Sequence, residues 1–508
     1  MFRIFFTFLF FASPMALQAA LHWTPFQAVP SSAVSSFQLA VNKKSKALLA
    51  WYESSDQTIK TSFYDFLEKD WTQPDILTTQ GGTISLLAMR FTEAETAALL
   101  WFDSQTNSLN LSKHEPGLGW ASPFILSLPF PAVDVRSLFD FQGNMSLVWS
   151  AWNGLQHIIQ GVFYSEDLQT WSTISDLSPV GFNCYSPRIA MNSNGQGAVV
   201  WQAVISTGSE TNQSFVQAVM FNRSHFQWSS PLYFGYDWIG TYLSNPDVAI
   251  DKANNVAILW ENKRPENRDT RVQYVRYVVK KNQWSYVSEM EAGTLNPQFG
   301  NHFQNIQVYW TTCAGTNQGL NIAQLDIENN IWFGLHNFAK AEKDISNLKI
   351  KMDPLEKLNL MWLNQSSLQV AHYDKGWTPS IHLDKNMRCD AFDFASDAIG
   401  NVMLTILHEG QLLYCTGNYL LPPDYFEGRK IEVRYPSRKM THGHLIWSHA
   451  ESPNVMAYVL RRNSEILAIL PVQVRQFIDY RCPNTTVRYE LTIVNVDNIE
   501  SLPVKRVL

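Results

Sequence analysis

The chain repeats one pattern, in which short apolar runs alternate with residues that form turns, and residues 187–231 show it clearly. Apolar runs occupy 187–191, 198–201 and 215–221, and a fourth begins at Trp228. Asn, Ser and Gly residues separate these runs. Short apolar runs bounded by turn residues predict β-strands. Four such runs in succession therefore predict a small antiparallel sheet of four strands.

Tryptophan marks the same two places in each unit of this pattern. Trp201 lies at the end of the second expected strand, and equivalent residues recur at steps of about 50 residues: Trp51, Trp101, Trp149, Trp260, Trp310 and Trp362. A second series opens the fourth expected strand: Trp71, Trp120, Trp171, Trp228, Trp284, Trp332 and Trp377. Four strands in each unit at this period are typical of a β-propeller.

The two ends of the repeat array predict how its last unit is built. After the seventh unit, three strands are expected at 391–394, 400–406 and 411–414, without a tryptophan strand. Residues 23–29 form a fourth strand that has no partners near it in sequence. We therefore predict that this N-terminal strand completes the last sheet and closes a propeller of eight blades. Seven blades is the alternative, because residues 84–100 fit the repeat least well.

The tryptophan rhythm stops at residues 421–427, and Pro422-Pro423 marks a domain boundary there. We expect a β-propeller over 21–420 and a second domain over 425–508. The second domain has seven expected strands, which predict a β-sandwich: 431–435, 444–448, 455–461, 465–470, 476–478, 487–496 and 502–507.

The second domain resembles bacterial fibronectin type III domains. The similarity lies in Leu445-Ile-Trp447, in the stretches 458–463, 466–471 and 489–497, and in Glu500-Ser501. The resemblance implies that Trp447 is a core residue and that Tyr489 is the tyrosine of the corner between two strands. Asn498-Ile499 replace the glycine that the family usually has in the last turn. The whole chain thus resembles a secreted bacterial repeat protein with a C-terminal fibronectin-like domain.

Residues 1–20 are expected to be a secretory signal peptide. Arg3 gives the positive start, 4–12 are apolar, and 17–19 form an exit of small residues. The apolar run is too short to span a bilayer as a signal anchor, and no later segment has 18 uncharged apolar residues in sequence. We expect a soluble, monomeric protein exported to the periplasm, the outer surface or the medium. The net charge of −6, with no clustered basic patch, argues against nucleic-acid binding.

The five cysteines do not form a recognisable metal or disulfide pattern. They are scattered and include no Cys-x-x-Cys pair, so no zinc site and no cofactor are expected. Cys389 and Cys415 fall in one unit, on strands separated by another strand. That separation is about 9.5 Å, which is beyond the reach of a disulfide. Buried free thiols are therefore expected.

Candidate ligand-binding residues lie where the first strand of each unit begins, because propellers bind ligands at the mouth of their channel. Counting back from the repeated tryptophan gives one residue for each unit: Ser36, Leu86, Asp134, Ser186, Asn245, Asn296, Asn347 and Asp390. The seven polar members can hydrogen-bond a sugar, water or a cation. The alternative is a solvated rim, where such residues are favoured by local turn bonds.

We find no catalytic motif and expect no catalytic residue. A glycosidase needs two carboxylates about 5–9 Å apart, whereas Asp134 and Asp390 belong to distant units, and Asp247 is expected to face a neighbouring sheet. Residues 165–171 resemble a turn of sugar-processing propellers, but that turn lies away from their active sites. His442 and His444 are interpreted as outward neighbours on one strand rather than metal ligands.

These observations predict an exported, non-catalytic binding protein. Its ligand would be a protein or a glycan at the propeller mouth, with the sandwich domain as a spacer or adhesion module. The alternative is a carbohydrate-active hydrolase or lyase of the propeller type.

Overall fold

The computed structural model describes residues 21–508 except 67, 79–81, 141, 206–212, 236–241, 265–268, 291–292, 301–305, 315–316, 342–344, 356, 374–375, 384–386, 419, 421–422, 437, 450–454, 496–499 and 502. The expected signal peptide at 1–20 lies outside the described residues. The described residues are almost entirely β-strands and connections, with no α-helix and two single-turn 3-10 helices, η1 (Arg223–His225) and η2 (Val279–Lys281). None of the described helices is long and apolar enough to cross a membrane.

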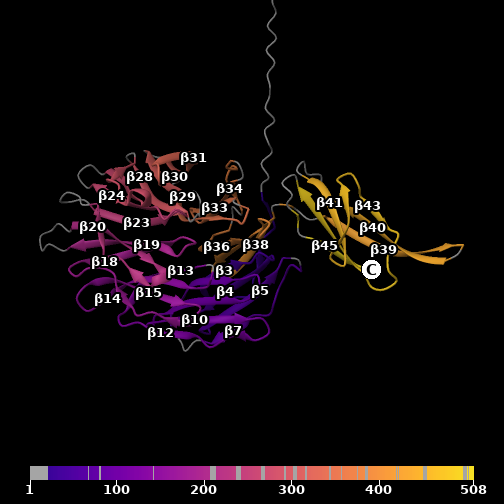
Figure 1. Ribbon diagram of the computed structural model, residues 1–508, viewed down its shortest axis with the longest axis horizontal. Helices are drawn as coiled ribbons and strands as arrows, with labels where there is room; N and C mark the ends of the chain where they lie inside the picture. Colours follow the sequence, from indigo (N-terminus) through magenta and orange to yellow (C-terminus); the bar gives the residue numbers. More distant parts are fainter. Residues whose placement is uncertain are drawn as a thin grey trace, which may run out of the picture.

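The N-terminal part folds into a series of antiparallel sheets (Figure 1). The first sheet contains β3 (Val34–Val41), β4 (Lys46–Glu53), β5 (Thr58–Asp65), β6 (Asp70–Trp71) and β7 (Asp75–Thr78). The second contains β8 (Ile84–Phe91), β9 (Ala97–Asp103), β10 (Ser108–Glu115), β11 (Gly119–Trp120) and β12 (Phe124–Ser127). The third contains β13 (Ala132–Phe139), β14 (Met145–Trp152), β15 (His157–Ser165), β16 (Thr170–Trp171) and β17 (Ser175–Asp176). The fourth contains β18 (Asn183–Met191), β19 (Gln196–Ile205), β20 (Gln213–Asn222), β21 (Gln227–Trp228) and β22 (Leu232–Phe234).

Four more sheets follow in the same chain order. The fifth contains β23 (Tyr242–Ile250), β24 (Val256–Arg264), β25 (Asp269–Val278), β26 (Gln283–Trp284) and β27 (Ser288–Glu289). The sixth contains β28 (Thr294–Gly300), β29 (Ile306–Ala314), β30 (Asn317–Asp326) and β31 (Ile331–Ala341). The seventh contains β32 (Ile345–Met352), β33 (Leu358–Asn364), β34 (Ser367–Tyr373) and β35 (Ile381–His382). The eighth contains β36 (Ala391–Ser396), β37 (Val402–His408), β38 (Gln411–Asn418), β1 (His22–Trp23) and β2 (Gln27–Ala28).

The eighth sheet joins the two ends of this part of the chain, as the sequence predicts. β1 runs antiparallel to β38, with Trp23 opposite Gly417. The indole ring lies directly over that glycine, since a Cβ added to Gly417 would stand 3.1 Å from ring atoms of Trp23. The absence of a side chain at residue 417 therefore makes room for the tryptophan.

The first tryptophan series lies opposite polar residues of the third strand. Trp149, Trp201 and Trp260 are fully buried. The indole N–H of Trp201 donates to Gln217 Oε1 (2.8 Å), and the other two donate to equivalent glutamines. Each buried N–H thus has a partner, which a buried tryptophan requires. The repeated tryptophans therefore mark one equivalent place in each sheet.

Two strand predictions need correction. The second strand of the fourth sheet continues past Trp201 to Ile205. It does so because the antiparallel strand β20 is equally long and pairs with it up to Ile205. The expected fourth strand is broken into β21 and β22, on either side of Pro231. The third and fifth sheets have the same break, between β16 and β17 and between β26 and β27, without a proline, so the break belongs to the repeated unit rather than to Pro231.

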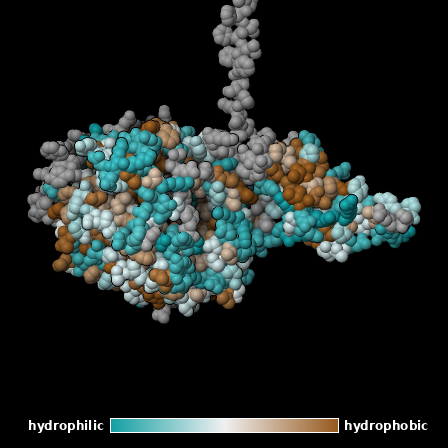
Figure 2. Space-filling model, in the orientation of Figure 1, coloured by the Kyte–Doolittle hydropathy of each residue, from teal (hydrophilic) through white to brown (hydrophobic). Residues whose placement is uncertain are grey.

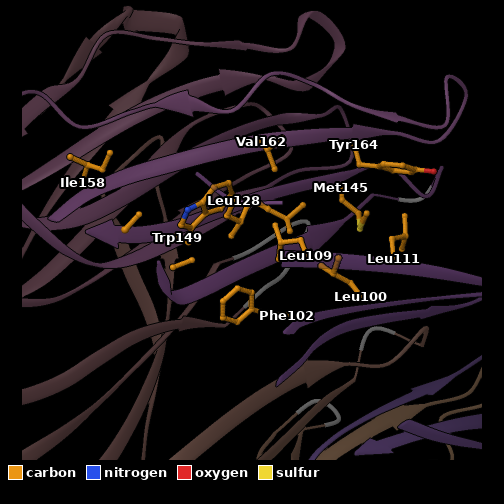
Figure 3. Close-up of a cluster of buried hydrophobic side chains, with 13 residues drawn as sticks. Leu100, Phe102, Leu109, Leu111, Leu128, Met145, Trp149, Ile158, Val162 and Tyr164 are labelled. Atoms are coloured by element: carbon orange, nitrogen blue, oxygen red, sulfur yellow. The ribbon is translucent and has the colours of Figure 1, made fainter. Parts of the chain in front are cut away.

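Apolar clusters join each sheet to its neighbour. Figure 3 shows one of them, in which Leu100 and Leu109 of the second sheet pack against Met145 and Trp149 of the third. A similar cluster joins the first and eighth sheets and includes Tyr64 and Tyr414. The first strands of successive sheets also adjoin one another, and β3 contacts both β8 and β36.

The C-terminal part forms two sheets, which lie beside the N-terminal sheets in Figure 1. One has the order β39-β40-β43, from β39 (Tyr425–Tyr435), β40 (Arg438–Ser448) and β43 (Gln476–Asp479). The other has the order β42-β41-β44-β45, from β42 (Glu465–Pro471), β41 (Val455–Arg462), β44 (Arg488–Asn495) and β45 (Val504–Val507). Both sheets contribute to one core.

That core contains the residues that the sequence placed there. Trp447 and Tyr489 are buried in it with Tyr458 and Leu491. The Tyr489 hydroxyl donates to the Asp479 carboxylate (2.7 Å). Asn498-Ile499, which replace the expected glycine, lie outside the described residues. The cysteines with a described side chain are buried and free, as expected: Cys184, Cys389, Cys415 and Cys482.

Candidate functional site

The predicted mouth residues of the first seven sheets lie at or beside β-bulges of the first strands. In the first seven sheets, the pairing of first and second strands shifts register at this position. Five predicted residues occupy the bulge with a positive φ between 47° and 54°: Asp134, Ser186, Asn245, Asn296 and Asn347. Asn and Asp are the side chains that best tolerate this left-handed conformation. The backbone therefore provides a local reason for their polar character.

The remaining predicted residues lie in different settings. Leu86 is buried, and its backbone N–H donates to the Ser36 hydroxyl (2.9 Å), which links the first two sheets. Asp390 precedes β36, whose pairing with β37 has no bulge. Its carboxylate accepts hydrogen bonds from Arg388 Nε (2.9 Å) and from the backbone N–H of Glu409 (3.2 Å).

The predicted residues differ in their access to solvent. Asn245, Asn296, Asn347 and Asp390 are exposed, whereas Ser36, Asp134 and Ser186 are half-buried. The two carboxylates of this set are each engaged by an arginine two residues away, Asp134 by Arg136 and Asp390 by Arg388. The bulges therefore present amides, hydroxyls and paired carboxylates. Their role in ligand binding stays a prediction.

A second layer of side chains follows directly after the bulges. Its members lie opposite the residue that precedes the repeated tryptophan, or at the corresponding place of the eighth sheet: Gln38, Ala88, Arg136, Arg188, Asp247, Gln298, Lys349 and Asp393. Sequence reasoning considered only Asp247 of this layer and missed the other members. The signal was present, because five charged residues stand two or three positions after the predicted ring residues.

Several side chains of this layer bond to the neighbouring sheet. Gln38 Nε2 donates to the Leu86 carbonyl (3.2 Å). Asp247 accepts the backbone N–H of Phe299 in the sixth sheet (2.8 Å), which confirms that it faces a neighbouring sheet. Asp393 accepts the backbone N–H of Leu39 in the first sheet (3.3 Å) in the same way. The layer therefore ties successive first strands together.

One part of this layer, with the bulge residue beside it, is the arginine cluster, which we define as Asp134, Arg136, Arg188, Asp247 and Tyr309. Arg136 donates to one carboxylate oxygen of Asp134, and Arg188 Nη1 lies 3.6 Å from the other. Removal from solvent and the adjacent positive charge of Arg188 lower the pKa of Arg136 below its ordinary value. The cluster thus places two like-charged guanidinium groups on either side of one carboxylate.

Two members of the arginine cluster, Asp247 and Tyr309, have shifted pKa values. Burial raises the pKa of Asp247 to about 6, although two backbone N–H bonds and both arginines favour its charged form. Burial also raises the pKa of Tyr309 above its ordinary value, and the nearby Asp247 charge acts in the same direction. The Tyr309 hydroxyl donates to Gln298 Oε1.

The other charged part of the layer is the lysine cluster, which we define as Lys349, Lys351 and Asp393. Lys351 Nζ lies 2.8 Å and Lys349 Nζ 3.2 Å from Asp393 Oδ1. Each ammonium also donates to a carbonyl of β36 and lies over a phenylalanine ring of that strand. Burial opposes the ionisation of Asp393, but the two ammonium groups outweigh it and lower its pKa to about 2.

The described residues include no group of three His, Cys, Asp or Glu side chains that could hold a metal ion. His442 was expected to point outward, but it is buried, with its ring 5.1 Å from the Tyr480 ring and 6.1 Å from the Tyr435 ring. These two aromatic side chains cover it. His444, two residues further along β40, is half-buried.

No protein-family model and no curated protein matches this chain. Solved structures that are similar include the polysaccharide lyase Uly1, with 8% identity over 80% of this chain and 94% of that chain and a TM-score of 0.45. The β-propeller domain of the Trilobed protease from Pyrococcus furiosus has 8% identity over 70% and 96%, with a TM-score of 0.38. The Trypanosoma rangeli sialidase has 7% identity over 76% and 85%, with a TM-score of 0.33. The structural neighbours thus include β-propeller proteins.

Proposed function

We propose that this chain is an exported, non-catalytic binding protein with an eight-bladed β-propeller and a fibronectin type III-like domain. The blades are the eight sheets, and β1 closes the propeller by pairing with β38. Supporting this, the first strands of the first and eighth sheets adjoin. Residues 1–20 direct export, and the C-terminal pair of sheets serves as a spacer or adhesion module.

The ligand is a glycan or a protein, bound where the first strands begin. One observation supports this above all: the bulges present several exposed amides at equivalent places, among them Asn245, Asn296 and Asn347. Amides both donate and accept hydrogen bonds, so they suit sugar hydroxyls and peptide groups alike. The carboxylates of Asp134 and Asp390 are occupied by arginines, which disfavours a pair of free acids for hydrolysis.

Binding of the purified protein to arrays of glycans and peptides tests this proposal. A double variant, Asn245→Gly with Asn347→Gly, removes two amides and keeps the left-handed backbone, because glycine adopts it freely. We expect affinity for the array ligand to fall at least about tenfold, as two hydrogen bonds would give. Asn282→Gly is the matched control, since Asn282 has φ 48° in the outer turn after η2. Unchanged binding by the double variant would contradict the proposal.

A carbohydrate-active hydrolase or lyase is the second candidate. The observation in its favour is Asp247, whose pKa of about 6 allows proton transfer near neutral pH, beside Tyr309. Incubating the protein with neutral and acidic polysaccharides and measuring new reducing ends or unsaturated products tests it. Turnover that Asp247→Asn abolishes, in a folded variant, would support the enzyme and overturn the non-catalytic proposal.

A further inference from the structure

The two guanidinium groups of the arginine cluster have more donors than their neighbours use. A guanidinium has five N–H donors. Among the described residues, Arg136 donates to Asp134, and Arg188 donates to the Pro187 carbonyl (2.9 Å). The side chains of Arg136 and Arg188 are 43% and 37% exposed. Both groups can therefore still bind an acceptor that arrives from solution.

The chemistry of that acceptor follows from what already lies between the arginines. Asp134 places a carboxylate between Arg136 and Arg188, and it is itself 29% exposed. Planar guanidinium groups match carboxylates geometrically, and charge-assisted hydrogen bonds are the strong ones. The two arginines lie at equivalent positions of adjacent strands, β13 and β18, so their repulsion also favours an anion between them.

The residues beside the cluster indicate what else the ligand offers. Asp134 and Ser186 stand at the bulges directly before Arg136 and Arg188, and Asn245 stands at the next bulge. Hydroxyl and amide groups thus accompany the two cations. A ligand that presents a carboxylate among many hydroxyls fits this set, as an acidic sugar does.

We propose that the arginine cluster recognises the carboxylate of a uronate-containing glycan, so that the ligand of this protein is an acidic polysaccharide. This inference rests on the proposed binding function and specifies its ligand. Asp134 competes with that carboxylate for both guanidinium groups. Its replacement by asparagine removes the competing charge, and asparagine fits the left-handed bulge as it does at Asn245, Asn296 and Asn347.

Calorimetric titration with trigalacturonate and with its methyl ester tests the inference, because the two probes differ in the charge of the carboxyl groups. We expect the acid to bind at least about tenfold more tightly than the ester. Arg136→Gln with Arg188→Gln should remove that preference, while Asp134→Asn should strengthen binding of the acid about threefold or more. Arg434→Gln on β39 is the control for lost positive charge and should change neither affinity.

Three outcomes separate failure of this inference from failure of the binding function. Equal binding of acid and ester overturns the carboxylate role and leaves a neutral glycan ligand. Arginine-dependent binding of an acidic peptide, without binding of trigalacturonate, overturns the glycan class. Binding of no array ligand at all overturns the proposed function itself. Circular dichroism of each variant confirms that it is folded before the affinities are compared.

Discussion

The arginine cluster and the lysine cluster occupy the same layer of the first strands, yet they use their charges differently. In the lysine cluster, the Asp393 carboxylate lies within β36 and its side chain is only 10% exposed. In the arginine cluster, the Asp134 carboxylate lies on a bulge and is 29% exposed. The arginine cluster also has an acid within the strand, Asp247, at the place equivalent to Asp393, so the additional acid on the bulge, Asp134, separates the two clusters.

An acid within the strand ties sheets together. Asp393 joins Lys349 and Lys351 of the seventh sheet to the backbone of Leu39 in the first sheet. An acid on the bulge is itself partly exposed, although the cations of the two clusters are similarly exposed, at 43% and 37% for the arginines and 42% and 39% for the lysines. Under the proposed function, one layer would serve stability in the lysine cluster and ligand binding in the arginine cluster. Figure 2 shows a further contrast, since hydrophilic side chains cover much of the visible N-terminal face, whereas hydrophobic ones gather over β41.

The largest expected effect is on stability. Asp393→Asn leaves two ammonium groups without their carboxylate, and we expect the free energy of unfolding to fall by about 3 kcal/mol at pH 7. Asp134→Asn should change it by less than about 1 kcal/mol, because the Asp134 carboxylate is itself partly exposed to water. Urea denaturation followed by tryptophan fluorescence measures both. Similar losses in the two variants would remove the distinction between the clusters.

The second effect concerns acid stability. The pKa of Asp393 is lowered to about 2, so its ionisation stabilises the folded protein above pH ~4 and loses this effect as the pH falls towards 2. We expect this group to contribute about 2 kcal/mol at neutral pH. The urea midpoint of the wild type should therefore fall below pH 4 more steeply than that of Asp393→Asn. Parallel pH profiles would show that the lysine cluster does not stabilise the fold.

The smallest effect concerns the bulge itself. Asp134→Ala forces an alanine into φ 52° and should cost about 1 kcal/mol of unfolding free energy. Asp134→Gly should cost less, since glycine adopts this conformation without strain. The comparison of the two denaturation curves isolates backbone strain from the loss of the carboxylate. An alanine variant as stable as the glycine variant would mean that the bulge does not select the residue type.

The order of the sheets could be predicted from the sequence because a buried tryptophan ring requires specific packing, so tryptophan recurs at equivalent places of the sheets. Trp201 and its equivalents recur in the buried second strands, and the N-terminal strand at Trp23 was correctly predicted to complete the last sheet. The break in the outer strand was not predicted, since it also occurs in the third and fifth sheets, where no proline stands between the two parts.

The charged layer could not be found in the same way. A bulge inserts one residue and shifts the alternation of the strand, so counting back from Trp149 or Trp201 identified Asp134 and Ser186 rather than Arg136 and Arg188. The pattern of side chains also varies from sheet to sheet, unlike the tryptophans. Burial of His442 depends on the ring of Tyr480, which is distant in sequence, and on the ring of Tyr435 in the adjoining strand, and neither was expected to cover it.

The pairing of β1 with β38 constrains the order in which this protein can fold during its synthesis. Trp23 leaves the ribosome early, but Gly417, against which it packs, is synthesised nearly four hundred residues later. Contacts between residues so distant along the chain form slowly, because the entropy of closing a large loop is lost before the contacts can stabilise the fold. β1 therefore cannot pair until β38 has been synthesised. A polypeptide that crossed a membrane before then would do so before its eighth sheet had formed.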